Sequence, residues 1–372
     1  MKIKVWSVKR PSYSNRIIYF LLLGWVSTTY SNCSMDFADP ISFSERPYTI
    51  VLLPDTQKYK HENRGSTVHI FSSQTQWIVD HVLDENIVLV LHLGDIVDYS
   101  DKDQWNFARQ NLSIMDRIVP YVLAVGNHDI LHLDGTKSTR LFNEFFKVDN
   151  FKKSPSFGGV FQENRLENSY YIYSFQKTNY VVLSLQYCPN DQILEWANKI
   201  VTKYSESKVI VVTHSYLGKD GKHIEPGDKT NLSNCETFWP EGKGNEGKQI
   251  WEKLIRKHSN MQFVFSGHLP GSRLISKGLN GNPVFQLSAD YQDLENGGNG
   301  FMQLLKFSIE KDKESVSVKT YSPFLDEYKT DTGSQFADSH VFCQHVVAVF
   351  QFLPLRPYPT DNVLGPHLID GG

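Results

Sequence analysis

Apolar runs of five or six residues alternate with amphipathic stretches along most of the chain, beginning near residue 47. The runs over 48–53 and 87–91 predict strands, and residues 68–86 between them place Trp77, Val82 and Leu83 on the apolar side of a helix. Further strands are expected at 120–125, 180–184, 208–213 and 261–265, and further helices at 102–117, 190–203 and 246–258. Because such strands are typical of sheets covered on both faces, the pattern predicts an α/β layered fold.

The pattern changes toward the C-terminal end. Strands without intervening helices are predicted over 283–288, 301–309 and 314–321, and no internal repeat or linker divides residues 46–335. We therefore expect residues 46–335 to form one domain. Residues 336–372 contain an apolar stretch at 341–355, followed by several prolines, and continue no earlier pattern, so we interpret them as a tail.

Residues 1–34 have the features of a secretory signal peptide. Lysines and arginines without any acid precede a short apolar run at 17–26, and small or polar residues follow. Such a run is short for a membrane-spanning helix, which needs about 20 residues. We therefore expect a protein of the secretory pathway or the extracellular space. The alternative is an uncleaved signal anchor that tethers the chain to a membrane.

The composition is that of a globular protein, with 40% apolar and 21% charged residues and a formal net charge of −3. Without the five bases of the N-terminal segment, 33 bases remain against 41 acids, a formal charge of −8. This balance gives no support for specific nucleic-acid binding, which needs a basic face.

The four cysteines are Cys33, Cys188, Cys235 and Cys343. Cys188 and Cys235 both fall in loops after predicted strands, so this pair is the first candidate for a disulfide in an oxidising compartment. Asn111-Leu-Ser and Asn231-Leu-Ser are glycosylation motifs, which would make a secreted chain a glycoprotein.

Polar side chains follow five of the predicted strands at the point where each apolar run stops. In open α/β sheets, ligand-binding groups gather at the carboxyl ends of strands. Oxygen and imidazole donors at that edge suit Mn, Fe or Zn rather than thiolate chemistry, so the five ends together predict a metal site. The side chains are Asp55 and Gln57; His92, Asp95 and Asp98; Asn127, His128 and Asp129; His214; and His268.

The other histidines stand in less marked contexts and are interpreted as structural. They are His61, His69, His81, His132, His223 and His258.

These motifs resemble those of the calcineurin-like metallophosphoesterase superfamily, to which purple acid phosphatases and many nucleases belong. The resemblance covers about residues 47–325 and implies a four-layer α/β/β/α sandwich of two mixed sheets flanked by helices. A narrower resemblance, to a secreted and bacterial-type subgroup, comes from Pro54-Asp-Thr-Gln57 in place of Asp-x-His, from Ala289-Asp-Tyr-Gln292 and from residues 319–328.

The resemblance implies a centre of two divalent metal ions, of Mn, Fe, Zn or Mg. Asp95 would bridge the ions, and the second metal would be held by Asn127, His214 and His268. The first metal would be held by Asp55 and Gln57.

The first metal departs from the family pattern. Gln57 stands where the family has a histidine, and Pro270 replaces the last histidine of Gly-His-x-His. We therefore expect a weakly held first ion, such as Mg²⁺ or Mn²⁺, or one bound only with substrate. Asp290 or Tyr291 is a candidate for a further contact.

The resemblance further implies hydrolysis of phosphate monoesters or diesters by a hydroxide that two metals activate. His128 would protonate or stabilise the leaving oxygen, and Asp98 or Asp129 would orient His128. His92 is either part of the site or structural.

The expected substrate is a phosphorylated small molecule, a nucleotide or a phosphoprotein. The alternative to an enzyme is a secreted metal-binding scaffold glycoprotein on the same fold with little or no turnover.

Overall fold

The computed structural model describes residues 46–60, 67–228, 234–240, 243–310, 313–331 and 333–338, all within the unit formed by residues 43–372. The predicted signal, Cys33, His61, Asn231 and Cys343 lie outside the described residues. The strands are β1 (Tyr48–Leu53), β2 (Ile87–His92), β3 (Tyr121–Leu123), β4 (Leu131–Leu133), β5 (Thr136–Ser138), β6 (Phe157–Val160), β7 (Ser169–Phe175), β8 (Thr178–Ser184), β9 (Lys208–Val212), β10 (Met261–Ser266), β11 (Ser272–Lys277), β12 (Pro283–Ser288), β13 (Met302–Glu310), β14 (Lys313–Ser322), β15 (Glu327–Lys329) and β16 (Gln335–Asp338). The α-helices are α1 (Val68–Asp80), α2 (Lys102–Leu112), α3 (Arg140–Phe145), α4 (Val148–Phe151), α5 (Asp191–Lys203), α6 (Cys235–Phe238) and α7 (Gly247–Lys253).

The strands form two large mixed sheets and a small hairpin of β4 and β5. The first sheet has the order β15-β14-β13-β1-β2-β3, with β16 also paired to β14. The second has the order β11-β12-β10-β9-β8-β7-β6. Within them, β1, β2 and β3 run parallel, and so do β8, β9, β10 and β12, while the outer strands pair antiparallel.

The first strand shows why the sheets are covered on both faces. Successive side chains of a strand point to opposite faces, and every residue of β1 is buried. Ile50 and Leu52 pack between the two sheets, against side chains such as Ile210. Val51 and Leu53 face the other way and pack against the helices. An uninterrupted apolar run is therefore what this position requires.

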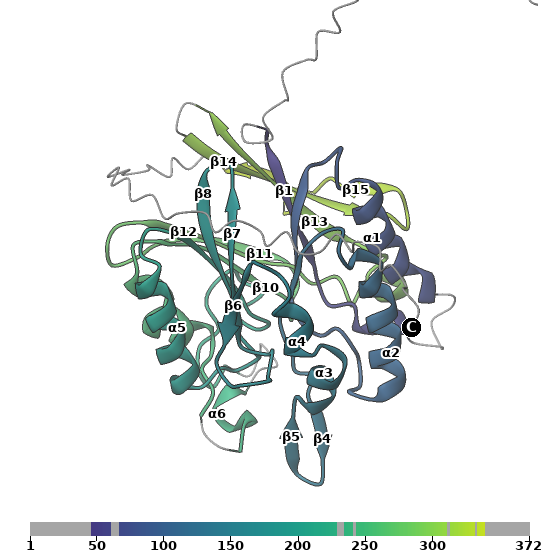
Figure 1. Cartoon of the computed structure of the whole chain (residues 1–372), viewed down its shortest axis with the longest axis horizontal. Coiled ribbons are helices and arrows are strands. Elements are labelled where there is room, and N and C mark those ends of the chain that lie inside the picture. Colours follow the sequence, from purple (N-terminus) through teal and green to yellow (C-terminus); the bar gives the residue numbers. More distant parts are fainter. Residues whose placement is uncertain are drawn as a thin grey trace, which may run out of the picture. The chain divides into compact units, whose positions relative to one another are not determined.

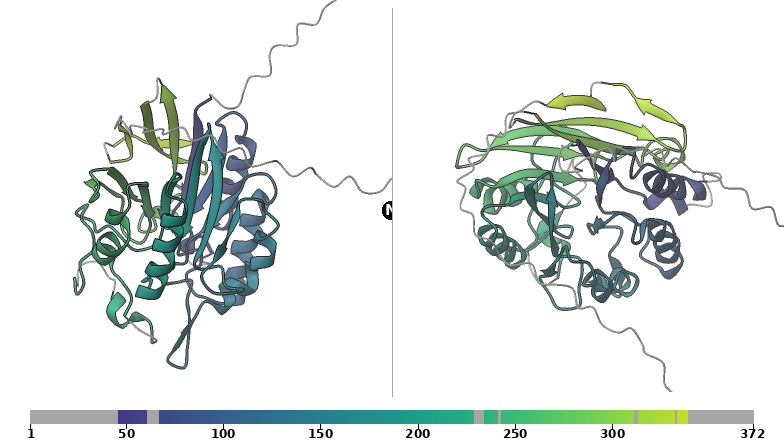
Figure 2. Two further views of the ribbon diagram at one scale, coloured as in Figure 1. Left: turned by 60° about the vertical axis from the view of Figure 1, so that its left-hand side comes forward. Right: turned by 45° about the horizontal axis from the view of Figure 1, so that its top comes forward.

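Helices cover the outer face of each sheet (Figures 1 and 2). α1 and α2 contribute Ile70, Phe71 and Trp105 to the core on the first sheet. α5 and α7 contribute Ile193 and Trp251 to the core on the second. The predicted four-layer α/β/β/α sandwich is thereby confirmed.

Several element boundaries differ from those expected. α1 ends at Asp80 rather than near residue 86, because turns follow it and Asn86 adopts a left-handed φ of 50° before β2 begins. β3 has only three residues, since it is an edge strand that pairs with β2 alone. β16 extends to Asp338, so the first sheet reaches into the segment that we interpret as a tail.

No helix among the described residues is long and apolar enough to cross a membrane.

Candidate metal centre

The candidate ligands meet where the carboxyl ends of parallel strands from the two sheets come together. The first sheet supplies Asp55 after β1, Asp95 after β2 and Asn127 after β3, and the second supplies His214 after β9 and His268 after β10. Donor atoms of Asp95, His214 and His268 all lie within 4.8 Å of one another.

The Nε2 atom of His214 lies close to oxygens from three different loops. It is 3.1 Å from Asp95 Oδ2, 3.1 Å from Asn127 Oδ1 and 3.9 Å from Asp55 Oδ1. The other ring nitrogen, Nδ1, donates to the carbonyl oxygen of Leu93 at 2.9 Å, which leaves Nε2 as the ligand atom. Ionised carboxylates and amide oxygens only accept hydrogen bonds, so a proton or a cation must lie among these atoms. The residues therefore fit a metal ion.

Two glycines of the motifs allow the loops to approach this closely. A Cβ atom on Gly126 would lie 2.1 Å from Asp95 Oδ1, and one on Gly267 would lie 2.5 Å from Asp55 Oδ2. Asp95 and His268 themselves have positive φ values of 49° and 71°. Such backbone conformations are rare for residues other than glycine and are concentrated at functional sites.

The site concentrates negative charge in a buried volume. Burial, followed by the neighbouring Asp290 and Asp95, raises the pKa of Asp55 well above its ordinary value. Burial also raises the pKa of Asp290. Burial alone would raise the pKa of Asp95, but His214, together with His128 and His268, outweighs burial and holds that pKa at about 2. Burial alone would lower the pKa of His214, but Asp95, together with the Leu93 carbonyl and Asp129, outweighs burial and raises that pKa. Buried carboxylates need a compensating positive charge, which divalent cations would supply.

Asp129 organises the loops around the site. Its carboxylate accepts hydrogen bonds from the backbone N–H groups of Ile96 at 2.8 Å, Val97 at 3.1 Å and Gly126 at 2.8 Å. Burial and the nearby Asp95 raise the pKa of Asp129 to about 8. Asp129 thus joins the loop after β2 to the loop after β3.

His128 contacts Asp98, the other residue expected to orient it. The Nδ1 atom of His128 donates to the backbone carbonyl of Asp98 at 2.7 Å and lies 3.5 Å from its Oδ1 atom. The backbone N–H of His128 donates to Asp95 Oδ1 at 2.9 Å. The side chain of His128 is 36% exposed, so the ring is accessible to a ligand. Lys58, which the sequence did not single out for this role, contacts Asp98 Oδ1 at 2.5 Å.

His92 is structural. It is fully buried, its Nδ1 atom accepts from the backbone N–H of Gly94 at 3.2 Å, and its Nε2 atom lies 3.0 Å from Thr56 Oγ1. Burial lowers its pKa to about 3, so the ring is neutral at physiological pH.

Gln57 lies two residues after Asp55, at the start of the loop that follows β1. Its backbone N–H donates to the carbonyl of Asp95 at 3.0 Å, and the residue is only 1% exposed. Its side-chain Nε2 donates to Gln292 Oε1. The backbone bond therefore ties Gln57 to the loop of Asp95, and the side-chain bond ties it to the segment after β12.

A disulfide supports one wall of the site. The predicted bond between Cys188 and Cys235 is confirmed, with 5.0 Å between the Cα atoms. Next to it, the ring of Tyr187 lies 5.9 Å from His214 and 5.7 Å from His268. Phe238, three residues after Cys235, packs edge-on against Tyr187 at 4.8 Å. The disulfide therefore anchors the segment that carries Phe238, which packs against Tyr187 beside the two histidines.

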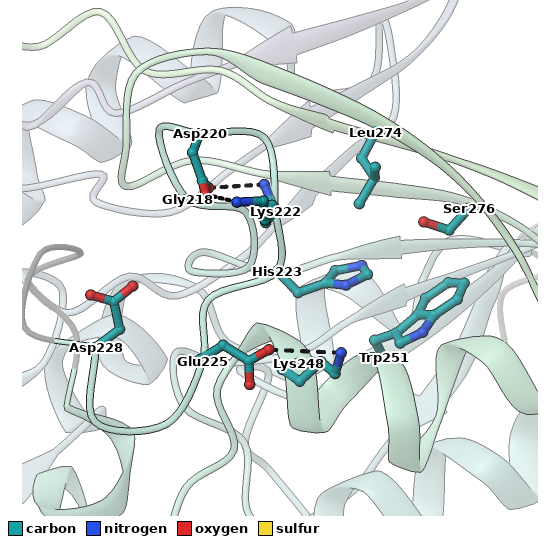
Figure 3. Close-up of a pocket in the computed structure, with 10 residues that line it drawn as sticks. All are labelled: Gly218, Asp220, Lys222, His223, Glu225, Asp228, Lys248, Trp251, Leu274 and Ser276. Carbon is teal, nitrogen blue, oxygen red and sulfur yellow. Dashed lines mark hydrogen bonds and ion pairs between the residues drawn. The ribbon is translucent and has the colours of Figure 1, made fainter.

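A cavity of about 490 Å³ lies apart from the candidate ligands, lined by residues 218–228, α7 and β11 (Figure 3). His223 stacks on Trp251 at 5.0 Å there, and its Nε2 atom lies 2.7 Å from Gln286 Oε1, which agrees with a structural role. Lys222 and Lys248 pair with Asp220 and Glu225 respectively (Figure 3).

A family model described as calcineurin-like phosphoesterase matches residues 48–272. The chain belongs to the calcineurin-like phosphoesterases. The description of this family agrees with the expected enzyme class, a hydrolase of phosphate ester bonds.

A curated relative is the uncharacterized protein YvnB of Bacillus subtilis (strain 168), which is 33% identical over 306 residues. The match covers 79% of this chain and 21% of YvnB, so the chain spans about a fifth of that relative's length. Similar structures include the purple acid phosphatase PPD1 from yellow lupin (Lupinus luteus) seeds, with a TM-score of 0.49, 15% identity and coverage of 80% of this chain and 55% of that one. Another is GAP50, the anchor in the inner membrane complex of Plasmodium, with a TM-score of 0.46, 10% identity and coverage of 79% and 89%. Both TM-scores are low, so the assignment rests on the family model.

Proposed function

We propose that the chain hydrolyses phosphate monoesters or diesters at a centre of two divalent metal ions, of Mn, Fe, Zn or Mg. Asp95 would bridge the ions, Asn127, His214 and His268 would hold the second, and Asp55 and Gln57 the first. The observation that carries the proposal is the convergence of three loop oxygens on His214 Nε2. When bound, divalent cations neutralise phosphoryl oxygens and make a nucleophilic water available near neutral pH.

His128 is proposed as the proton donor. The attacking water loses one proton to solvent and its oxygen forms a bond to phosphorus, while the bond from phosphorus to the leaving oxygen breaks and a proton on His128 Nε2 passes to that oxygen. The hydrogen bond from His128 Nδ1 to the Asp98 carbonyl supports this role, because it fixes the ring and makes Nε2 the atom that exchanges a proton. Lys58 supports it indirectly by neutralising the Asp98 carboxylate.

We also propose that the chain is secreted after removal of residues 1–34, with a membrane tether through an uncleaved anchor as the alternative. The buried Cys188–Cys235 disulfide supports an oxidising compartment. Of the two glycosylation motifs, Asn111 lies in α2 with only 7% exposure, and its amide donates to the Phe107 carbonyl at 2.8 Å. The folded conformation therefore does not offer Asn111 to a glycan.

The enzymatic proposal is tested on purified protein stripped of metal by a chelator. Mn²⁺, Fe²⁺, Zn²⁺ or Mg²⁺ is then restored, and hydrolysis of an aryl phosphate monoester and an aryl phosphodiester is measured. We expect metal-dependent release of the aryl alcohol by the wild type, and loss of both bound metal and activity in Asp95→Ala. No metal-dependent release with either ester would favour the binding protein without turnover, which the altered residues Gln57 and Pro270 motivate.

A further inference from the structure

The two halves of the centre carry different kinds of donor. The second metal's candidate ligands include two imidazoles, those of His214 and His268. Around the first metal, Gln57 and Pro270 stand where the family pattern has histidines, so the remaining side chains there are carboxylates and amides. A subsite of this kind works only if the Gln57 amide turns its oxygen, rather than its NH₂ group, toward the ion.

A further strand end completes this half of the site. β12 runs parallel to β10 with Ser288 in register with Ser266, and Asp290 follows two residues later. The backbone N–H of Ala289 donates to the carbonyl of Ser266 at 2.9 Å. Asp290 therefore lies beside the loop that carries His268, and it is only 6% exposed.

Asp290 and Gln292 together determine which way the Gln57 amide faces. Asp290 accepts two hydrogen bonds from Gln292, one from the backbone N–H at 2.8 Å and one from Nε2 at 3.0 Å. An ionised carboxylate only accepts hydrogen bonds, so Gln292 must direct its NH₂ group toward Asp290. The Oε1 atom of Gln292 is then free to accept a hydrogen bond from Gln57 Nε2.

The remaining amide atom of Gln57 is consequently its oxygen. Gln57 Oε1 is buried and has no hydrogen-bond partner among the residues that the structure describes. An unpaired buried carbonyl destabilises the fold, and a bound cation would offset that cost. The hydrogen-bond chain thus leaves a buried, unpaired oxygen on Gln57, two residues after Asp55, where a cation could bind.

We propose that Asp290 and Gln292 act as positioning residues that present the Gln57 oxygen to the first metal. With Asp55 and Asp95, the Gln57 oxygen would make an all-oxygen subsite for a hard divalent cation, Mg²⁺, Mn²⁺ or Ca²⁺. This subsite would lie next to an imidazole-containing subsite that suits Zn²⁺ or Fe²⁺. This inference rests on the metal centre of the proposed function. It adds that the two subsites select different ions and that residues 290–292 set the selectivity of one of them.

The test measures metal binding to the full chain without substrate. Metal-free protein is titrated calorimetrically with Mn²⁺, and again with Mg²⁺ after one equivalent of Zn²⁺ has been added. We expect two Mn²⁺ sites of unequal affinity in the wild type, and Mg²⁺ binding to the zinc-loaded protein. In Gln292→Met, the weaker site should lose about 10- to 100-fold in affinity while the tighter site is unchanged.

Two further variants separate positioning from general damage. Gln303→Met is the matched control, because Gln303 is also a buried glutamine with an unpaired Oε1 atom, and its Nε2 donates to the neighbouring Tyr291 hydroxyl at 3.0 Å. It should bind both ions as the wild type does. In the double variant Asp290→Asn with Gln292→Glu, the amide introduced at position 290 can donate to a carboxylate that still accepts from Gln57, so the weaker site should recover.

Three outcomes would overturn the inference: a single Mn²⁺ site in the wild type, unchanged weak-site affinity in Gln292→Met, or equal loss in Gln303→Met. None of them depends on turnover. A protein that binds two ions as described yet hydrolyses no ester would refute the proposed function and leave the inference standing.

Discussion

Removal of the Cys188–Cys235 disulfide should destabilise the domain by a predictable amount. The bond joins residues 47 apart in the sequence. In the chain-entropy model, closing a loop of that length costs the unfolded chain about 14 cal/mol/K, which is about 4 kcal/mol at 25 °C. Both cysteines are 1% exposed, so alanine replacement also removes two buried sulfur atoms from the core around α6.

The background protein carries Cys33→Ala and Cys343→Ala. It is compared with the same chain that also carries Cys188→Ala and Cys235→Ala. Urea unfolding of the metal-free proteins gives the free energies of unfolding. We expect a loss of about 4 kcal/mol in the chain without the bond. A similar fall should follow reduction of the background protein by a thiol, which leaves the two cysteine side chains in place.

A loss below about 1 kcal/mol would refute this reasoning, since it would mean that other contacts already restrict the segment as strongly in the unfolded chain. One contact that could do so is the hydrogen bond from Trp239 Nε1 to the Tyr187 carbonyl at 3.0 Å, which closes a loop of similar length. A change in the denaturant dependence of the free energy would identify that case, because it reports on the compactness of the unfolded state.

Three further predictions concern the site and the core. His128→Ala should leave metal content unchanged and lower turnover by about 10²- to 10⁴-fold, and unchanged turnover would remove its assigned role. Gln57→His should raise the affinity of the weaker site for Zn²⁺ measured by calorimetry, because an imidazole replaces a carbonyl oxygen; an unchanged affinity would mean that the side chain is not a ligand. Burial raises the pKa of Tyr171 and Tyr180 above the ordinary value of 10, so their contribution to stability is complete below pH 10 and is lost as pH rises above it. Urea unfolding at pH 9 to 11 should show a loss of about 1.4 kcal/mol per pH unit above pH 10 for each such tyrosine, and a flat profile would contradict this.

The strands that carry the ligands could be predicted from the sequence because they are buried on both faces. β1, β2, β9 and β10 are mostly apolar, and a polar residue either ends each strand or follows it within two residues. β11, Ser-Arg-Leu-Ile-Ser-Lys, was not predicted because an edge strand that is half exposed mixes polar and apolar residues. β7 was missed for a related reason, since its tyrosines and serines do not form a continuous apolar run.

The contacts that tune the site could not be read from the sequence in the same way. The link between Gln57 and Gln292 joins residues 235 positions apart, and no periodicity relates them. The sequence shows the motif around Gln292, but the contact of Gln292 with Gln57 depends on the pairing of β12 with β10. Lys58 is a similar case, because a lysine in a loop is ordinarily solvated and only the fold brings it to Asp98.

The division of donors between the sheets connects the stability of the fold to the chemistry of the site. The first sheet supplies oxygen donors from Asp55, Asp95 and Asn127, and the second supplies the imidazoles of His214 and His268. These groups come within reach of one another only because the core between the sheets holds the strand ends together. A cation bound across that boundary relieves the repulsion among the buried carboxylates, and it binds the packed state in preference to the unfolded one. Metal binding should therefore stabilise the contact between the sheets as a matter of linkage. Under the proposed function, the same cations would also have to attract a phosphate ester, because the acidic character of the chain would repel it.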